Sequence, residues 1–169
     1  NDGGKVRFCY NEGTATADNN GKTAGVIGVN NYGEVYQCFN TGHITHSAAS
    51  CTAGVVGMNT GGMVSYCYNT GDIDGYTNTA GVSAYNEEGS TIRICFNTGN
   101  ITGENTITGG IASTMYDASV ISDCYNWGDV YSVWHTTGGI SAGCSGYNEN
   151  SGTLASQIIN CYNIGNISN

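Results

Sequence analysis

Residues 52–73 read TAGVVGMNTGGMVSYCYNTGDI, and this stretch decides the fold because the rest of the chain repeats it. Its tripeptide Cys-(Tyr/Phe)-Asn occurs six times, with intervals of 29, 29, 28, 29 and 37 residues between successive cysteines. A glycine follows each cysteine four residues later, and a β-branched aliphatic residue precedes each by three. Such a period is the signature of a repeat architecture. The cysteines of this column are Cys9, Cys38, Cys67, Cys95, Cys124 and Cys161.

Each repeat contains short β-branched runs that are separated by turns rich in Gly and Asn. Runs this short, without a 3.6-residue period, do not form helical repeats. A unit of 28–29 residues fits one coil of a parallel β-helix (β-solenoid), in which each strand pairs with its equivalent about 4.8 Å away. We therefore expect an all-β, single-domain solenoid of about five to six coils over residues 1–169, with a longer fifth coil that carries a loop insertion at 143–154.

Stacking turns each column of the repeat into a ladder along the axis. The aliphatic columns that contain Val35 and Ile44 never carry a charge, so they are expected to face the core. A third column holds only small residues and suggests a narrow corner: Gly28, Gly57, Ala84, Ser113 and Ala142. An asparagine column precedes a glycine turn, where Asn tolerates left-handed φ and stacked amides can hydrogen-bond. We interpret it as structural: Asn11, Asn40, Asn69, Asn97, Asn126 and Asn163.

The chain has eight cysteines, an even count that is typical of disulfide-bonded extracellular proteins. Neighbours in the six-cysteine column would have Cα atoms about 4.8 Å apart, which is within disulfide range. Parallel side chains nevertheless fit the required torsion poorly, so we favour a ladder of reduced, buried thiols and keep pairing as the alternative. Cys-x-x-Cys pairs that converge on zinc are missing, and we expect no metal and no cofactor.

Charge composition narrows the classes of partner. The net charge is −9 and only four residues are basic, which argues against nucleic-acid binding and against anionic lipid headgroups. No window contains about 18 apolar residues, so we expect no membrane insertion. The chain opens on Asn1 without a recognisable signal peptide. We expect it to be an excerpt of a longer solenoid whose open ends fray or stack end to end.

Several polar residues were considered for catalysis. Asp72 and Asp129 share a column two coils apart, and a separation of about 10 Å lies at the upper edge of inverting glycoside hydrolases. We interpret them as solvated acids beside a turn, with weak calcium binding as the alternative. No serine or cysteine stands at a recognisable spacing from His43, His46 or His135, which favours surface histidines over a catalytic triad.

The strongest local anomaly is aromatic. Trp127, Tyr131 and Trp134 lie within eight residues and include both tryptophans of the chain. Amphipathic rings grouped on a surface can form a platform for a sugar face or a protein partner, so these three are our candidate ligand-binding residues. The alternative is that Trp134 caps the core beneath the neighbouring insertion.

The stretch 52–73 resembles the GLUG repeat, which reads roughly G-L-V-G-x-N-x-G-x-I-x-N-C-Y-A-T-G-x-V. That repeat occurs in bacterial surface proteins, in adhesin-like proteins and in the non-catalytic parts of some IgA-cleaving metallopeptidases. The resemblance covers nearly the whole chain and departs from the pattern at 111–119 and 143–154. It implies an extracellular or cell-surface setting and brings no active site, since no His-Glu-x-x-His is present.

Together these features predict a non-catalytic stalk or adhesive binding module whose ligand is a glycan or a host or surface protein. Two alternatives remain open. One is a polysaccharide-cleaving enzyme on the same fold, and the other is a purely structural, filament-forming solenoid. An outward-facing rank of threonines would favour a variant of the latter that interacts with ice: Thr23, Thr52, Thr79, Thr108 and Thr137.

Overall fold

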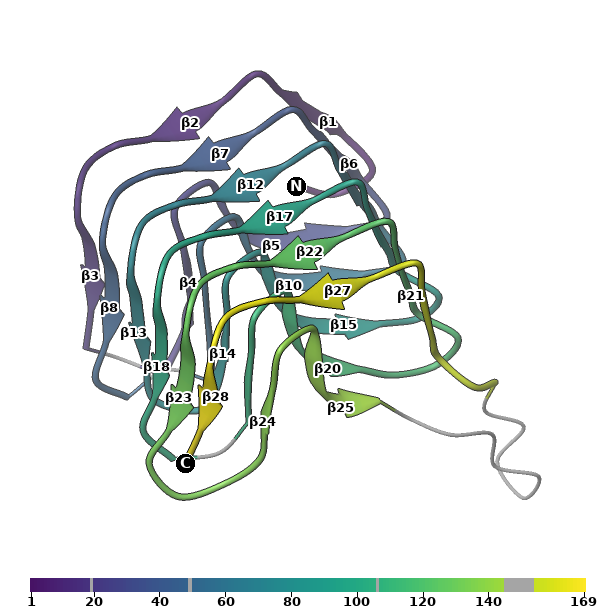
Figure 1. Cartoon of the computed structure of the whole chain (residues 1–169). Helices are drawn as coiled ribbons and strands as arrows, with labels where there is room; N and C mark the ends of the chain where they lie inside the picture. Colours follow the sequence, from purple (N-terminus) through teal and green to yellow (C-terminus); the bar gives the residue numbers. More distant parts are fainter. Residues whose placement is uncertain (19, 49, 106, 145–153) are drawn as a thin grey trace.

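The computed structural model describes residues 1–18, 20–48, 50–105, 107–144 and 154–169. These residues form short strands and no helix, and they wind into a parallel β-solenoid of about five turns (Figure 1). The predicted fold class is therefore confirmed. The loop insertion expected at 143–154 falls almost entirely on 145–153, outside the described residues. Within the described ranges, no helix is long and apolar enough to cross a membrane.

Each complete coil contributes one strand to each of five parallel sheets, which follow one another in chain order. The first sheet comprises β1 (Lys5–Arg7), β6 (Glu34–Tyr36), β11 (Met63–Ser65), β16 (Thr91–Arg93), β21 (Val120–Ser122) and β26 (Gln157–Ile159). The second comprises β2 (Tyr10–Asn11), β7 (Phe39–Asn40), β12 (Tyr68–Asn69), β17 (Phe96–Asn97), β22 (Tyr125–Asn126) and β27 (Tyr162–Asn163).

The third sheet comprises β3 (Ala15–Ala17), β8 (Ile44–His46), β13 (Ile73–Gly75), β18 (Ile101–Gly103), β23 (Val130–Ser132) and β28 (Ile167–Ser168). The fourth comprises β4 (Lys22–Ala24), β9 (Cys51–Ala53), β14 (Asn78–Ala80), β19 (Thr108–Gly109) and β24 (Thr137–Gly138). The fifth comprises β5 (Ile27–Asn31), β10 (Val56–Thr60), β15 (Ser83–Glu87), β20 (Ala112–Met115) and β25 (Ser141–Cys144).

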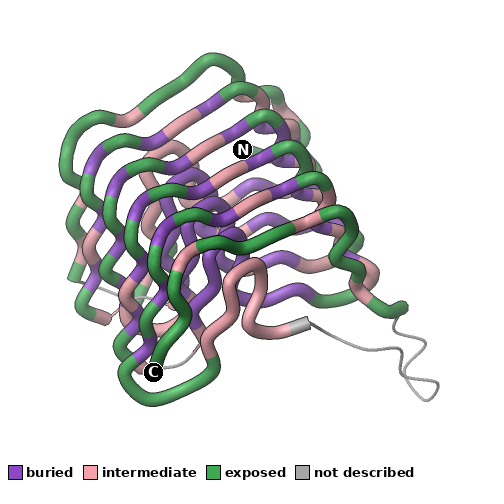
Figure 2. Tube along the Cα trace, in the orientation of Figure 1, coloured by how far each residue is buried: buried purple, intermediate pink, exposed green. Residues whose placement is uncertain are grey.

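The chain folds back on itself within each coil. The fourth sheet returns alongside the third, and the fifth then leads back towards the first (Figure 1). Buried positions recur at the same place in successive coils, whereas the first and last coils are largely exposed (Figure 2). Val35 and Ile44 have no exposed surface, which confirms that their columns face inward. The main apolar cluster joins the first and fifth sheets, and a second lines the third sheet.

The asparagine column forms a continuous hydrogen-bonded ladder. Asn40 Nδ2 donates to Asn69 Oδ1 at 2.7 Å and, in its own coil, to the Gly42 carbonyl at 2.7 Å. The same two bonds recur from Asn11 to Asn126, and the chain of amides ends on Asn163. Both hydrogens of each of these amides are therefore used, which satisfies polar groups that would be costly to bury unpaired. The amide ladder was predicted, but these asparagines lie in strands and not in the left-handed conformation.

A second asparagine ladder, which we did not predict, lies at the corner between the fifth and first sheets. Asn1 Nδ2 donates to Asn30 Oδ1 at 2.7 Å, and Asn30 Nδ2 donates to Asn59 Oδ1 at 2.8 Å. In the next coil the pattern changes, because the Asn86 amide donates to the backbone carbonyls of Ser83 and Thr114. The Gly-x-Asn element at Asn30 and Asn59 is the sequence feature that indicates this ladder. The element is absent from the next coil, where the turn is longer.

The ladders explain why glycine is required at specific places. A Cβ at Gly54 would lie 2.4 Å from Asn69 Oδ1 and 2.3 Å from the Gly81 carbonyl oxygen. A Cβ at Gly71 would lie 2.1 Å from the carbonyl oxygen of Gly42 in the preceding coil. Such separations are too short for real atoms, so a side chain at either position would push neighbouring coils apart.

Two expectations about columns were wrong. The small residues expected at a narrow corner lie second in the strands of the fifth sheet, where Ala84 packs against Cys51, Ala53 and Ala80 of the fourth. They are small because the fourth and fifth sheets meet closely. The threonines do not form an outward rank: Thr52, Thr79 and Thr108 are fully buried and approach the third sheet. The interpretation as an ice-binding face is therefore excluded.

The glycine requirement can be tested within one column. In the 169-residue chain, Gly71→Ala is expected to lower the free energy of unfolding by about 3 kcal/mol or more, because the new methyl group overlaps the Gly42 carbonyl. Gly13→Ala in the first coil is the matched control, since its Cβ would meet nothing closer than Asn11 Oδ1 at 3.9 Å. That change is expected to stay within about 1 kcal/mol of the wild type. Equal effects of the two substitutions in chemical denaturation would contradict the stacking geometry.

Candidate functional site

The three predicted ligand-binding residues are exposed. Trp127 follows the buried Asn126 at the corner between β22 and β23, and 59% of its surface is exposed. Tyr131 points outward from β23 and is 43% exposed, and Trp134 follows the same strand and is 75% exposed. Trp134 therefore does not cap the core. None of the ring pairs in the described part of the chain joins two of these three residues, so they form separate projections and not one stacked platform.

Asp72 and Asp129 act as caps between coils. Asp72 Oδ1 accepts a hydrogen bond from the Asn100 backbone N–H at 2.9 Å, and Asn100 Oδ1 accepts from that of Asp129 at 3.3 Å. Asp129 Oδ1 in turn accepts from the N–H of Asn166 at 2.8 Å. These exposed side chains thus continue the hydrogen bonding of the ladder at a corner. Within the described ranges, no group of three or more His, Cys, Asp or Glu residues is placed to hold a metal ion.

The histidines lie in different surroundings. His43 Nε2 is 2.8 Å from Asp74 Oδ2 on the surface, in an open depression of about 510 Å³ that Asp72, Asn100 and Thr102 also line. Among the residues that line it, Thr102 carries a hydroxyl group, and no serine or cysteine is present. His46 is only 3% exposed, which corrects the expectation of a surface residue: it ends β8 and accepts a hydrogen bond from the Ala48 N–H at Nδ1.

The cysteine column is a ladder of free thiols, as favoured from the sequence. Cys67 Sγ accepts a hydrogen bond from the Cys38 backbone N–H at 3.4 Å and donates to the Ser65 carbonyl at 3.2 Å. Cys95 and Cys124 repeat both contacts, and Cys161 Sγ accepts from the N–H of Cys124. The thiol therefore supplies hydrogen bonds at a corner of the coil. The residue before each cysteine has positive φ at this corner: Phe8, Gln37, Tyr66, Ile94, Asp123 and Asn160.

The outward position of the Cys-(Tyr/Phe)-Asn tripeptide forms an aromatic ladder that we did not predict. Successive rings are 4.8 to 5.3 Å apart and within 1° to 7° of parallel. Because each ring covers the face of the next, only ring edges remain free along the column, and a sugar face cannot stack there. The ladder is structural. Its members are Tyr10, Phe39, Tyr68, Phe96, Tyr125 and Tyr162.

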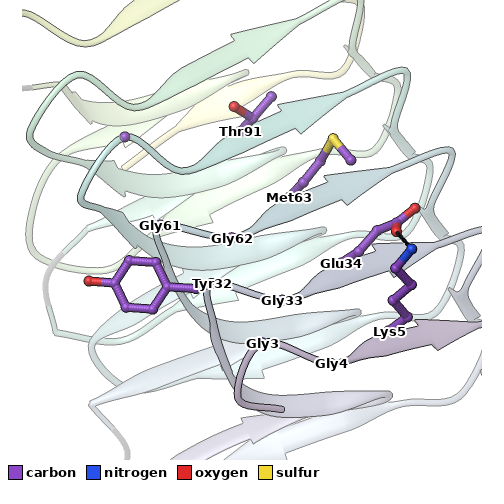
Figure 3. A pocket seen from close by; sticks show the side chains of 11 residues that line it. Gly3, Gly4, Lys5, Tyr32, Gly33, Glu34, Gly61, Gly62, Met63 and Thr91 are labelled. Carbon is purple, nitrogen blue, oxygen red and sulfur yellow. Dashed lines mark ion pairs between the residues drawn. The ribbon is translucent and has the colours of Figure 1, made fainter.

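A groove that the sequence did not indicate runs along the axis where the fifth sheet turns into the first (Figure 3). It encloses about 280 Å³. Glycine backbone forms its floor, Tyr32 stands on one side, and Lys5, Glu34, Met63 and Thr91 stand on the other. The available signal was the column Gly3, Tyr32, Gly61, in which an aromatic residue replaces glycine.

No protein-family model matches the chain, and neither a curated protein nor a solved structure shows significant similarity to it. The fold and its ladders define the chain as a β-solenoid repeat protein with coils of about 29 residues, asparagine ladders and a buried cysteine stack. No family is identified.

Thiol reactivity should follow position in the ladder. Burial raises the pKa of the Cys95 thiol well above its usual range and also raises the pKa of Cys51. Cys9 is exposed and serves as the internal control. Mass-spectrometric mapping after brief alkylation of the native protein is expected to find Cys9 modified much faster than Cys67 or Cys95, because the thiols of the latter two are buried and the reagent cannot reach them.

The same pKa shifts predict a pH dependence of stability. Above about pH 8.5 the unfolded chain loses the thiol protons of Cys51 and Cys95, which the folded chain retains, so the contribution of these two thiols to the free energy of unfolding should fall as pH rises. Denaturation at increasing pH measures this fall. Stability that rises over that range, or Cys95 alkylated as rapidly as Cys9, would contradict a buried, protonated ladder.

Proposed function

We propose that this chain is a non-catalytic, extracellular or cell-surface β-solenoid that acts as a stiff stalk and presents an adhesive surface to a glycan or a surface protein. The observation that carries the proposal is the exposure of both tryptophans, 59% for Trp127 and 75% for Trp134, beside Tyr131. Large amphipathic rings contribute strongly to binding at interfaces, and their exposure on a regular scaffold favours such a role.

Stiffness supports the role of a stalk. Successive coils are joined by strand pairing in all five sheets and by side-chain ladders at the corners. Each coil therefore transmits force to the next through many parallel hydrogen bonds. Repeats that contact only their neighbours can also be added without redesign of the core, which suits a spacer of variable length.

The remaining polar residues favour binding over catalysis. The carboxylates of Asp72 and Asp129 accept hydrogen bonds from backbone N–H groups of the neighbouring coil, and the depression that holds the His43–Asp74 pair is lined by no serine or cysteine. The extracellular setting rests on the acidic charge and on the resemblance to the GLUG repeat of bacterial surface proteins. The free thiols of Cys38, Cys67, Cys95 and Cys124 fit that setting because burial and hydrogen bonding shield them from oxidation.

Substitution of the tryptophans tests the proposal. On a panel of immobilised glycans and surface proteins, Trp127→Ala or Trp134→Ala is expected to weaken binding at least about tenfold, or about 1.4 kcal/mol, since each removes an exposed ring. Phe8→Ala is the control, because Phe8 is a comparably exposed aromatic residue in the first coil. Binding that both tryptophan variants retain, or that Phe8→Ala weakens equally, would refute the adhesive surface.

A further inference from the structure

We propose that the groove beside Tyr32 binds a short segment of a neutral glycan, with the tyrosine ring as its stacking surface. This inference rests on the proposed function and adds a second site to it. The turns that carry Tyr32 lie on the opposite side of the coil from the corner between β22 and β23, where Trp127 projects (Figure 1). The two surfaces can therefore be separated by experiment.

Tyr32 occupies a left-handed position that holds glycine in both adjacent coils. Its φ is +51°, and the equivalent residues of the neighbouring coils are Gly3 at +64° and Gly61 at +59°. Positive φ also occurs at bulky residues such as Phe8, Tyr66 and Ile94, so what distinguishes Tyr32 is that both adjacent coils have glycine at its position. The ring does not contribute to the core, because 63% of Tyr32 is exposed.

The ring is held in place before any ligand arrives. It lies against Gly61, where an added Cβ would be 2.4 Å from Tyr32 Cε1. The hydroxyl donates a hydrogen bond to the Glu88 carboxylate, which belongs to the coil beyond Gly61. That carboxylate also raises the pKa of Tyr32, so the phenol remains a donor. In Figure 3 the ring is seen face-on from the open side of the groove, which leaves one face free for stacking. A fixed ring reduces the entropy lost on binding.

The floor of the groove is bare for a structural reason. A Cβ at Gly33 would lie 2.5 Å from Asn30 Oδ1, and one at Gly62 would lie 2.3 Å from Asn30 Nδ2. The second asparagine ladder, to which Asn30 belongs, therefore excludes side chains at both positions. A ligand can consequently approach the backbone beside Tyr32, as glycine permits in many binding loops.

The chemistry of the groove favours a neutral polyhydroxyl ligand. Beside the floor, the N–H groups of Glu34, Met63 and Thr91 donate to carbonyls of the preceding coil, so these three are not free to bind an anion. The charged residues that line the groove are Lys5 and Glu34, whose side chains pair at 3.7 Å, so the formal charge of the lining is zero. Glu34 also pairs with Arg7 at 2.8 Å, outside the lining. What remains is an aromatic ring on one side of the groove and an ammonium group, a carboxylate and the Thr91 hydroxyl on the other, a set that suits an apolar sugar face and its hydroxyl groups.

The volume limits the length of the segment. At about 280 Å³ the groove is near the lower end of the range for small-molecule sites, which begins at about 300 Å³. It extends along the axis from Gly4 to Thr91, so a glycan chain would lie parallel to the solenoid axis and leave at both open ends. Recognition of a segment within a polysaccharide is expected, not recognition of a chain terminus.

Affinity electrophoresis of the whole chain tests the inference, in native gels that contain hydroxyethyl cellulose, xyloglucan, galactomannan, xylan or laminarin. The background is the Trp127→Ala, Trp134→Ala double variant, which removes the other candidate surface. We expect retardation by at least one neutral polysaccharide, and we expect Tyr32→Gly to weaken it at least tenfold. Because glycine is the residue of the neighbouring coils, Tyr32→Gly should leave the thermal unfolding midpoint unchanged or raise it. Glu88→Gln should weaken retardation less, since it loosens the ring without removing it.

The outcomes separate the two proposals. Retardation that Tyr32→Gly leaves unchanged overturns the Tyr32 site. Retardation of the wild type that disappears in the tryptophan background also overturns it and leaves the proposed function standing. Retardation only in gels with alginate or chitosan overturns the neutral class of ligand. If no neutral polysaccharide retards the wild type, the Tyr32 site is overturned. The adhesive surface around the tryptophans is then judged separately, by the binding experiment on the panel of glycans and surface proteins.

Discussion

The asparagine ladder is the constraint on which the rest of the structure depends. Each amide of the column uses both hydrogens, one towards the next coil and one towards a glycine carbonyl of its own coil. The ladder fills the space that side chains at Gly54 and Gly81 would need, so it also fixes where glycine recurs. The thiol ladder performs the same task at the next corner, with sulfur as acceptor for a backbone N–H that strand pairing does not satisfy. Coil length, corner position and strand register all follow from these columns.

Because the amides and thiols of these ladders are already hydrogen-bonded, we expect a ligand to be bound by side chains that point outward. The aromatic column covers its own ring faces, and the acidic column caps the neighbouring backbone, so neither offers a free recognition surface. The side chains that depart from their columns are different. Trp127 stands where the three preceding coils have threonine, and Tyr32 stands where both adjacent coils have glycine. In a repeat protein, the stacking of coils does not require a residue that differs from the others in its column. Each of the two proposed binding surfaces contains such a residue.

Much of the fold could be predicted because a period converts sequence columns directly into neighbours in space. The aliphatic, asparagine and cysteine columns were all placed correctly on this basis. The direction of other columns could not be deduced, because it depends on how the fourth sheet folds back onto the third. That packing buries Thr52 and demands small residues such as Ala84 in the fifth sheet. The Tyr32 groove depends on a left-handed φ and on a contact two coils away, neither of which the pattern of residue types reveals.

Hydrogen exchange of the side-chain amides tests the ladder most directly. In NMR spectra of the ¹⁵N-labelled chain, the Nδ2 hydrogens of Asn40, Asn69 and Asn97 should exchange as slowly as the backbone amides of the strands, because both hydrogens of each amide are donated in the interior. Asn20 lies on the surface and provides the reference for a solvated amide. Exchange of the ladder amides at the rate of Asn20, in a chain whose strand amides stay protected, would contradict the account.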